Sequence, residues 1–488
     1  MAVLYILLVM NEFDENYAKY VEVQYGDKRD PVRDASMIAS NDLLLPHAYT
    51  VSDRVDMTNI DVYSVDPVGC EDADDAFSVY TEFGRTFLAI HIADPTEFIS
   101  MRSDLWLDIE NKVITMYPSN TKPVHMMPHE IMERASLMDN GIGCGVSCDG
   151  GCVKNAITVL TEISCDTFLP INRVKLLFTH ILAKKRNTMS YESASRSVNS
   201  VMSLEFGLKI GQAMQEMRGK KTIGVKLKSV DKSIIDYACG YGGPRLRGVS
   251  PNETMMMQMI EEFAIFANSF VGEYLSIHLG GNGIFRACDA SAMTGDEFSS
   301  LSGNELLHHI ITNGIRADYM NTVASHDLVG SREYTHFTSP IRRASDCVCH
   351  YLLKYLYLRE ISGGATVVPF DSGRLAVLAE RCDVRSKKMK KVQYTDTKYR
   401  LIQVMHGILH RNGCLEIEYC VTGHIHGFVN IIIKRVDEFP VYLSYSLRRK
   451  SYDGVIDNKL MFTLQVGVIN CRERFDEGSI PELDALFV

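Results

Sequence analysis

Hydrophobic and polar residues alternate in three short stretches of the first hundred residues. The stretches 61–65, 76–80 and 86–92 follow the period of a β-strand, and the last is almost continuously apolar. Between Met256 and Tyr274, apolar residues recur at helical spacing along one face. The pattern therefore predicts a group of strands and a long helix that packs on a core.

The second half of the chain predicts two more helices and then a return to strands. A helix is expected to start at Thr338-Ser339-Pro340, because a hydroxyl residue before a proline is typical of a helix start. A basic helix is expected over about 381–405, and strands over 415–422, 427–434 and 441–446. These elements predict a mixed α/β (α+β) body followed by a small C-terminal β-barrel-like module.

Composition excludes several classes of protein without indicating a function. The chain has 488 residues, 46% of them hydrophobic and 23% charged, as in globular proteins of two or more domains. Its formal net charge of −10 does not suggest a nucleic-acid binder. We expect no membrane span and no signal peptide, because the early apolar run at 3–10 is short and lacks basic flanking residues. The thirteen cysteines are therefore expected to be reduced, in a cytoplasmic or alternatively a nuclear protein.

The densest group of chemically active side chains is acidic. Within ten residues, between the end of one predicted strand and the start of the next, lie Asp66, Asp72, Asp74 and Asp75. Carboxylates that meet at a strand end repel one another unless a cation lies between them, and all-oxygen ligands suit Mg²⁺ or Mn²⁺. The alternative is a solvated acidic turn, but the apolar flanking strands favour a metal site at a sheet end.

Two arginines, Arg342 and Arg343, follow the predicted helix start. Because the helix dipole disfavours cations there, an anion bound jointly by guanidinium, hydroxyl and free N–H groups would compensate, and a phosphate fits this description. The alternative is a plain ion pair with Asp346. A phosphate-binding arginine together with a hard-metal site is typical of phosphoryl transfer to water.

Both segments resemble motifs of one known family. The acidic segment 64–78 with His91-Ile-Ala-Asp94, and the segment 334–343, are similar to the RNB catalytic domain of the ribonuclease II family. Weaker matches follow in the expected order at 115–128, 188–192, 259–268 and 286, so that the resemblance covers roughly 54–400. It implies an RNB catalytic domain with a central sheet and surrounding helices over 54–405, and an S1-like β module over 406–488.

The resemblance also implies an activity. Members of the family are 3′→5′ exoribonucleases that hydrolyse single-stranded RNA to nucleoside 5′-monophosphates. By resemblance, Mg²⁺, with Mn²⁺ as a possible substitute, and the attacking water are held by the four aspartates; Asp72, Asp74 and Arg342 are catalytic, and Asp74 is the most sensitive. The same resemblance implies RNA contacts by Tyr117, which stacks on the terminal base, by Tyr191 and Glu262, which sense the ribose, and by Thr338, Ser339 and Arg343.

The chain departs from the family pattern in several places. Residues 1–53 form a short N-terminal region, which cannot hold the two cold-shock-type barrels that are usual in the family. We therefore expect weaker processivity in a monomer whose partner is single-stranded RNA and which does not bind a membrane. Ala344 stands where the family commonly has an aromatic residue, and Tyr351 where a basic residue is frequent.

Three alternatives remain open from the sequence. The first is a catalytically silent RNA-binding or complex-assembly protein with the same fold, although such a protein has no reason to retain four mutually repelling aspartates. The second is a phosphodiesterase for another nucleotide polymer. The third is a zinc site at Cys144, Cys148 and Cys152, which is disfavoured because the spacing is one residue too long and no histidine pair lies nearby.

Overall fold

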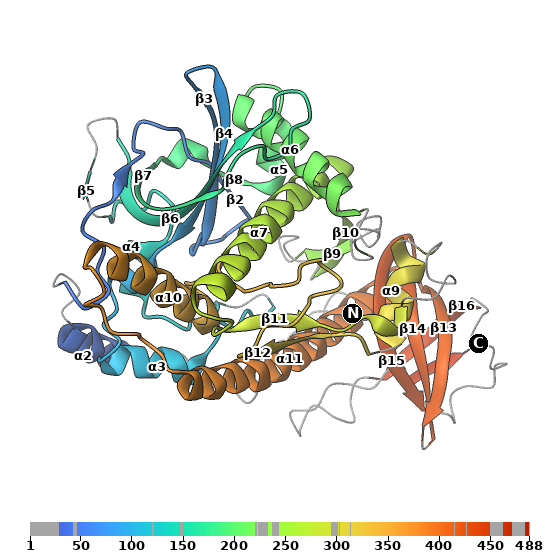
Figure 1. The fold of residues 1–488 in the computed structure, drawn as a ribbon. Coiled ribbons are helices and arrows are strands. Elements are labelled where there is room, and N and C mark those ends of the chain that lie inside the picture. The colour runs from blue at the N-terminus through green and yellow to red at the C-terminus, as the bar shows by residue number, and fades with distance from the viewer. Residues whose placement is uncertain are drawn as a thin grey trace.

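The body of the protein is built on a six-stranded sheet that helices cover (Figure 1). The computed structural model describes residues 29–41, 46–119, 122–143, 145–146, 150–219, 222, 233–236, 244–293, 301, 303–312, 314–413, 415–425, 427–448, 462–470 and 484–487. Most of the predicted N-terminal region, as well as Cys144 and Cys148, lies outside these residues.

The main sheet has the strand order β1-β7-β6-β4-β3, with β5 paired to β6. All of its pairs are antiparallel except β1 with β7. A separate parallel pair joins β2 to β8, and two short hairpin-like pairs join β9 to β10 and β11 to β12. The bounds are β1 Val55–Asp56, β2 Ser64–Asp66, β3 Asp75–Glu82, β4 Arg85–Ala93, β5 Gly145–Val146, β6 Cys152–Ile163, β7 Lys175–Ala183, β8 Thr188–Ser190, β9 Ser233–Asp236, β10 Arg245–Gly248, β11 Phe285–Cys288 and β12 Ala317–Met320.

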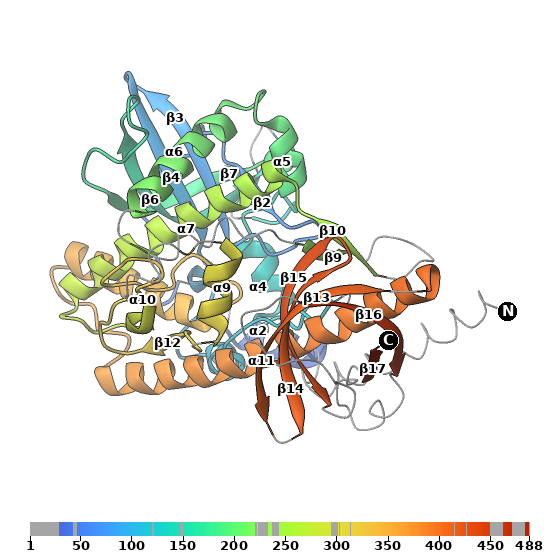
Figure 2. The ribbon, with the colours of Figure 1, turned by 90° about the vertical axis from the view of Figure 1, so that its right-hand side faces the viewer.

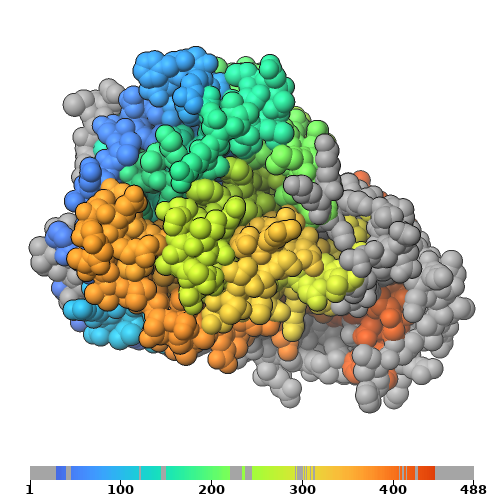
Figure 3. Space-filling model, viewed as in Figure 1, coloured from blue at the N-terminus to red at the C-terminus, as the bar shows by residue number. Residues whose placement is uncertain are grey.

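Helices pack against this sheet and against one another (Figures 1 and 2). The space-filling view shows the same face, with most of the blue and green first half above and the orange segment around α10 and α11 below, beside the cyan α3 (Figure 3). The helices are α2 Pro31–Asn41, α3 Asp104–Lys112, α4 His129–Ala135, α5 Tyr191–Ser197, α6 Met202–Gly219, α7 Pro251–His278, α9 Gly303–Thr312, α10 Ala344–Ile361 and α11 Ser372–Asn412, with short 3₁₀ turns at η1 Pro95–Glu97, η2 Lys185–Asn187 and η5 Ser291–Met293.

The strands predicted at 76–80 and 86–92 and the long helix occur where the alternation placed them, whereas the strand predicted at 61–65 is the shorter β2, which starts at Ser64. β4 is the apolar strand of the prediction, and eight of its nine residues are buried or half-buried. The helix α7 packs on the sheet through Phe263, whose ring lies 5.3 Å from that of Phe77 in β3. It also approaches other backbone closely, because a Cβ at Gly272 would lie 2.4 Å from the carbonyl oxygen of Glu333.

The helix expected at Thr338 starts six residues later, at Ala344, with Arg343 as its extended N-cap. The intervening residues form a turn. Two of its backbone N–H groups bind carboxylates, one far earlier in the chain and one in the first turn of α10. Ile341 N donates to Asp74 Oδ1 at 2.7 Å and Ser339 N donates to Asp346 Oδ1 at 2.8 Å. Both arginines therefore precede the helix, and the prediction that they lie in its first turn is wrong. The hydrogen bonds to Asp74 and Asp346 hold the backbone of residues 339–341 in a turn.

The C-terminal module is a five-stranded antiparallel sheet in the order β15-β14-β13-β16-β17. Its strands are β13 Glu416–Ile425, β14 Phe428–Val436, β15 Phe439–Arg448, β16 Phe462–Asn470 and β17 Asp484–Phe487. Among the described strands the pairs form an open path, without a pair that closes a barrel. The helix α11 is continuous across the predicted boundary at 405 and carries the sheet at its end (Figures 1 and 2).

No helix in the described ranges combines the length and the apolar character that a membrane crossing requires.

Candidate active site

A cavity of about 1310 Å³ opens between the loop that joins β2 to β3, the helix α7 and the turn before α10. Nine of the eleven residues predicted for the site line it: Asp66, Asp72, Asp74, Asp75, Tyr117, Tyr191, Thr338, Ser339 and Arg342. This volume exceeds that of most small-molecule pockets, which hold roughly 300–1,000 Å³. The cavity is therefore large enough for an extended ligand.

Strand pairing explains why the aspartates and Tyr191 meet. Asp66 ends β2 and pairs with Ser190 of the parallel strand β8, so the next residue, Tyr191, starts α5 beside it. Asp75 starts β3, and the carbonyl oxygen of Asp74 accepts a hydrogen bond from Ala93 N of β4 at 2.8 Å. The loop between the two strands is thus held at both ends by sheets.

Arg342 contacts the aspartate loop directly. Its Nε donates to Asp74 Oδ2 at 2.9 Å, and its Nη2 donates to Ser339 Oγ at 2.8 Å. The Arg342 side chain remains 43% exposed, whereas Asp74 is buried. Asp74 is therefore bound by two groups from the turn before α10, namely this guanidinium and the N–H of Ile341.

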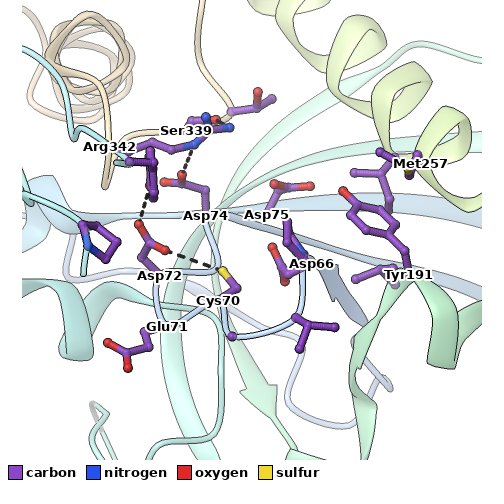
Figure 4. Close-up of a pocket in the computed structure, with 18 of the residues that line it drawn as sticks. Asp66, Cys70, Glu71, Asp72, Asp74, Asp75, Tyr191, Met257, Ser339 and Arg342 are labelled. Atoms are coloured by element: carbon purple, nitrogen blue, oxygen red, sulfur yellow. Dashed lines mark hydrogen bonds and ion pairs between the residues drawn. The ribbon is translucent and has the colours of Figure 1, made fainter. Parts of the chain in front are cut away.

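The two tyrosines lie on different sides of the loop. Tyr117 donates its hydroxyl hydrogen to Asp72 Oδ2 at 2.7 Å, and Cys70 Sγ lies 3.6 Å from the other oxygen of Asp72. Figure 4 shows Asp72 and Asp74 on the side of Arg342, and Asp66 and Asp75 on the side of Tyr191. Burial, and then the charge of nearby carboxylates, raise the pKa of both tyrosines, so their phenols stay protonated and available as donors.

Loss of solvent raises the pKa of three of the carboxyl groups, of which Asp74 is buried and Asp66 and Asp75 are half-buried. Burial raises the pKa of Asp74 well above its ordinary value, although the charge of Arg342 opposes this. Burial, and then the charge of Asp66, raise the pKa of Asp75 to about 7. Burial and the charge of Asp72 likewise raise the pKa of Asp66. Buried carboxyl groups with raised pKa values are common at functional sites.

The donor set fits a hard divalent cation. Four carboxylates on one loop supply the oxygen ligands that Mg²⁺ and Mn²⁺ prefer, and a cation would relieve the repulsion between Asp66 and Asp75. In the part of the chain that the structure describes, no three His, Cys, Asp or Glu side chains already converge as a metal cage. Instead, Asp72 is hydrogen-bonded to Tyr117 and Asp74 to Arg342.

Two predicted RNA contacts do not lie in the cavity lining. Arg343 points at Asp346, to which it donates from Nε at 2.9 Å and Nη2 at 2.8 Å, which is the ion pair that the sequence left open as an alternative. Glu262 is only 2% exposed and accepts from Arg218 Nε of α6 at 3.0 Å. Its neighbour Glu261 lines the cavity instead.

Sequence reasoning also missed several lining residues. On α7, the face of the helix that carries Glu261 also presents Thr254, Met257, Gln258 and Ala264. Their spacing of three and four residues marks one helix face, but the sequence does not tell which face meets the cavity. Near Tyr117 the lining continues with Lys122, His125 and His129.

His91, by contrast, has the structural role that its apolar strand predicts. The side chain is completely buried, and its two ring nitrogens lie 3.1 Å from Ser78 Oγ and 2.9 Å from Thr158 Oγ1. It is not part of the cavity lining.

Comparison with known proteins agrees with this architecture. A family model described as the RNB domain matches residues 54–359. The chain is 25% identical over 371 residues to the chloroplastic/mitochondrial ribonuclease II of Arabidopsis thaliana, covering 72% of this chain and 42% of that protein. Its fold is similar to that of Mycoplasma genitalium RNase R in complex with ribose-methylated single-stranded RNA, with a TM-score of 0.71, 17% identity, and coverage of 96% of this chain and 77% of that one.

A second structure qualifies what the fold implies. Yeast Ssd1, described as a pseudonuclease, has a TM-score of 0.62 and 17% identity, with coverage of 90% of this chain and 57% of that one. The chain spans about half the length of the curated relatives that it matches. Similarity of fold therefore does not decide activity. The family model covers well over half of the chain, and the chain belongs to the RNB-domain family.

Proposed function

We propose that this protein is a Mg²⁺-dependent 3′→5′ exoribonuclease that hydrolyses single-stranded RNA to nucleoside 5′-monophosphates. One observation carries the proposal: the four aspartates and Arg342 line a single cavity together with two tyrosines. Carboxylates that share a cavity, next to an exposed guanidinium, are the groups that phosphodiester hydrolysis needs.

Arg342 would act on the scissile phosphate. Its guanidinium is fixed at one edge by Asp74 and at Nη2 by Ser339, which orients the planar fork. The part of the side chain that remains exposed faces the cavity, where a phosphate oxygen that gains charge in the transition state would bind.

Asp66, Asp72, Asp74 and Asp75 would hold the divalent cation, with Mn²⁺ as a possible substitute. A bound cation acidifies water and steadies charge on phosphate oxygens. To become a ligand, Asp72 would exchange its bond to Tyr117, which would release the tyrosine ring to stack on the 3′-terminal base.

Recognition of the ribose is assigned to Tyr191 and Glu261. Both side chains line the cavity, whereas Glu262, the residue that the sequence suggested, is bound to Arg218. A hydroxyl and a carboxylate can both hydrogen-bond the 2′-OH, the group that distinguishes RNA from DNA.

The test is a time course on 5′-labelled single-stranded RNA with Mg²⁺, with an EDTA lane and the variants Asp74→Asn and Asp75→Asn. Asp166→Asn, on an exposed loop outside the cavity, is the matched control. We expect shortening from the 3′ end in the wild type and the control, and none in the other lanes. A DNA strand of the same sequence tests whether another nucleotide polymer is the substrate.

The alternative is a catalytically silent RNA-binding or complex-assembly protein, as the fold of Ssd1 allows. RNA that stays intact with both Mg²⁺ and Mn²⁺, yet is retarded on a gel by the wild-type protein, would establish that alternative. We further propose that the protein acts as a cytoplasmic monomer, or alternatively in the nucleus, with single-stranded RNA as its partner. We also propose that the body ends near residue 405 and that the C-terminal sheet is an S1-like RNA-binding module.

A further inference from the structure

One end of the cavity is basic. Lys122, His125 and His129 line it beyond Tyr117 and Asp72. The segment that carries the first two is fixed by the pairing of Met116 with Val124, whose backbone hydrogen bonds are 3.0 and 2.9 Å long. His129 is the first residue of α4, so three basic side chains from two elements meet at one place.

His125 has an unused hydrogen-bonding group at this place. Its Nδ1 is buried and has no hydrogen-bond partner within the described ranges of the chain. The backbone beside it is held, because Met126 N donates to Thr115 Oγ1 at 2.9 Å. A buried ring nitrogen without a partner is unfavourable, so a turn of the ring that brings this nitrogen to a ligand in the cavity would break no hydrogen bond of Nδ1.

The other two side chains are accessible to a ligand. Lys122 is exposed. The His129 side chain is 65% exposed, and the ion pair that it forms with Glu133 of its own helix, at 3.2 Å, lies on the surface, where such pairs are weak. Both can therefore turn toward an anion without losing a buried contact.

The rest of the cavity lining is mostly acidic, so the basic end is a place where a polyanion can bind. Six carboxyl groups line the same cavity, from Asp66, Glu71, Asp72, Asp74, Asp75 and Glu261, and Arg342 is the cation that binds Asp74 among them. A polyanion that enters such a cavity is repelled except where cations line it. A nucleotide chain carries one phosphate per nucleotide. If one phosphate binds Arg342, the neighbouring phosphates need other groups that bind an anion.

We propose that Lys122, His125 and His129 form a second phosphate-binding site, distinct from the phosphate site at Arg342. The inference rests on the proposed function, because its ligand is a nucleotide phosphate. That phosphate has two sources: a neighbouring backbone phosphate of bound RNA, or the phosphate of a released nucleoside 5′-monophosphate.

The experiment measures RNA binding without cleavage. Fluorescence anisotropy of a 5′-labelled single-stranded RNA in EDTA compares the wild type with the triple variant Lys122→Ala, His125→Gln and His129→Gln. The exposed pair Lys185→Ala and His278→Gln, outside the cavity, is the control. Lys122→Ala alone, on an exposed side chain, provides a variant that cannot unfold the protein through lost packing.

We expect the triple variant to bind RNA about tenfold more weakly and with a salt dependence that is shallower by about one unit, as for the loss of a phosphate contact. Lys122→Ala should weaken binding in the same direction, and the control pair should not. Equal affinities of the wild type and both cavity variants, with intact folding by circular dichroism, would overturn the proposal.

Competition by adenosine 5′-monophosphate separates the two sources. If the nucleotide displaces RNA from the wild type and does so less well from the triple variant, the site binds the phosphate of the product. If the nucleotide competes equally with both while RNA affinity falls, the site binds a backbone phosphate. The binding experiment does not depend on cleavage. If RNA binding depends on Lys122 but the wild-type protein does not hydrolyse RNA in Mg²⁺, the proposed function is wrong and the second phosphate site is still supported.

Discussion

At the scale of single residues, the four aspartates differ in what they bind. Asp74 accepts hydrogen bonds from Ile341 N and Arg342 Nε, so it joins the loop before β3 to the turn before α10. Asp75 has no such bond within the described residues, and burial beside Asp66 raises its pKa to about 7. Asp74 thus has a structural contact as well as a place in the site, whereas Asp75 contributes mainly charge.

This difference predicts opposite effects of two substitutions on stability. In EDTA, Asp75→Asn should raise the melting temperature by roughly 2 °C or more, because a buried repelling carboxylate is removed. Asp74→Asn should lower it, because the ion pair with Arg342 is lost. Both should abolish hydrolysis in Mg²⁺. Differential scanning calorimetry checks the first two effects, and a melting temperature that falls equally in both variants would refute the distinction.

Glu261 and Glu262 are adjacent, but we expect their replacement to affect different properties, RNA preference for Glu261 and stability for Glu262. Glu261→Gln should leave the free energy of unfolding within about 0.5 kcal/mol of the wild type and reduce the preference for RNA over DNA. Glu262→Gln should keep that preference and lose about 3 kcal/mol, since it leaves Arg218 without its buried partner. Urea unfolding and cleavage of matched RNA and DNA strands measure the two properties, and the reverse result would return the ribose contact to Glu262.

His91 predicts part of the acid sensitivity of the fold. Burial lowers the pKa of His91 to about 3, whereas an unfolded histidine titrates near 6.5. Below pH 6.5 the unfolded state therefore binds the proton first, and stability falls as the pH drops toward 3. His91→Gln should flatten this fall by up to about 1.4 kcal/mol per pH unit. Urea unfolding at several pH values tests this, and identical slopes for both proteins would argue against it.

At the scale of elements, the turn before α10 depends on one carboxylate. Asp346 is completely buried. It accepts hydrogen bonds from Ser339 N, from Ser345 Oγ, and from Nε and Nη2 of Arg343. Ser339 in turn accepts from Arg342. The first turn of α10 therefore orients the guanidinium in the cavity through a chain of two hydrogen bonds.

Asp346→Ala should accordingly affect both folding and catalysis. We expect a loss of about 3–5 kcal/mol of stability, because Arg343 is left as an unpaired buried charge. In the folded fraction, kcat should fall more than KM rises, since Arg342 loses its orientation but not its charge. Single-turnover cleavage at low temperature separates the two effects, and a variant with reduced stability but unchanged kcat would limit Asp346 to folding.

The elements show what a sequence can and cannot predict. Alternating apolar residues located β3 and β4, and because the aspartates flank strand ends their meeting was predictable. The start of α10 was not, because the N–H of Ile341 binds Asp74, a residue 267 positions earlier in the chain. The sequence could not show that Glu261 rather than Glu262 lines the cavity, since adjacent residues of α7 face about 100° apart and the motif does not give the rotation of the helix.

At the scale of the whole molecule, a protein with a net charge of −10 is predicted to bind RNA through a cavity that carries few cations. The groups of the cavity lining that can contact a phosphate are Arg342, Lys122, His125 and His129. Burial lowers the pKa of His125, so fixed positive charge comes from Arg342 and Lys122, and the lining would contact only a few phosphates. The slope of log K against log salt should therefore be no steeper than about −3. Anisotropy titrations from low to moderate salt measure it. A slope steeper than about −6 would show that a larger surface, such as the C-terminal sheet, carries the binding.

The double attachment of Asp74 has a consequence for how such a protein would change over evolutionary time. A lineage that gave up RNA cleavage would still be under selection to keep Asp74, because the turn that carries Ile341 and Arg342 depends on it. Asp75 and Asp66 would drift first, since replacing them relieves repulsion and spares the fold. In descendants of this chain, the survival of Asp75 would therefore be the better record of a working nuclease, and the survival of Asp74 mainly a record of its shape.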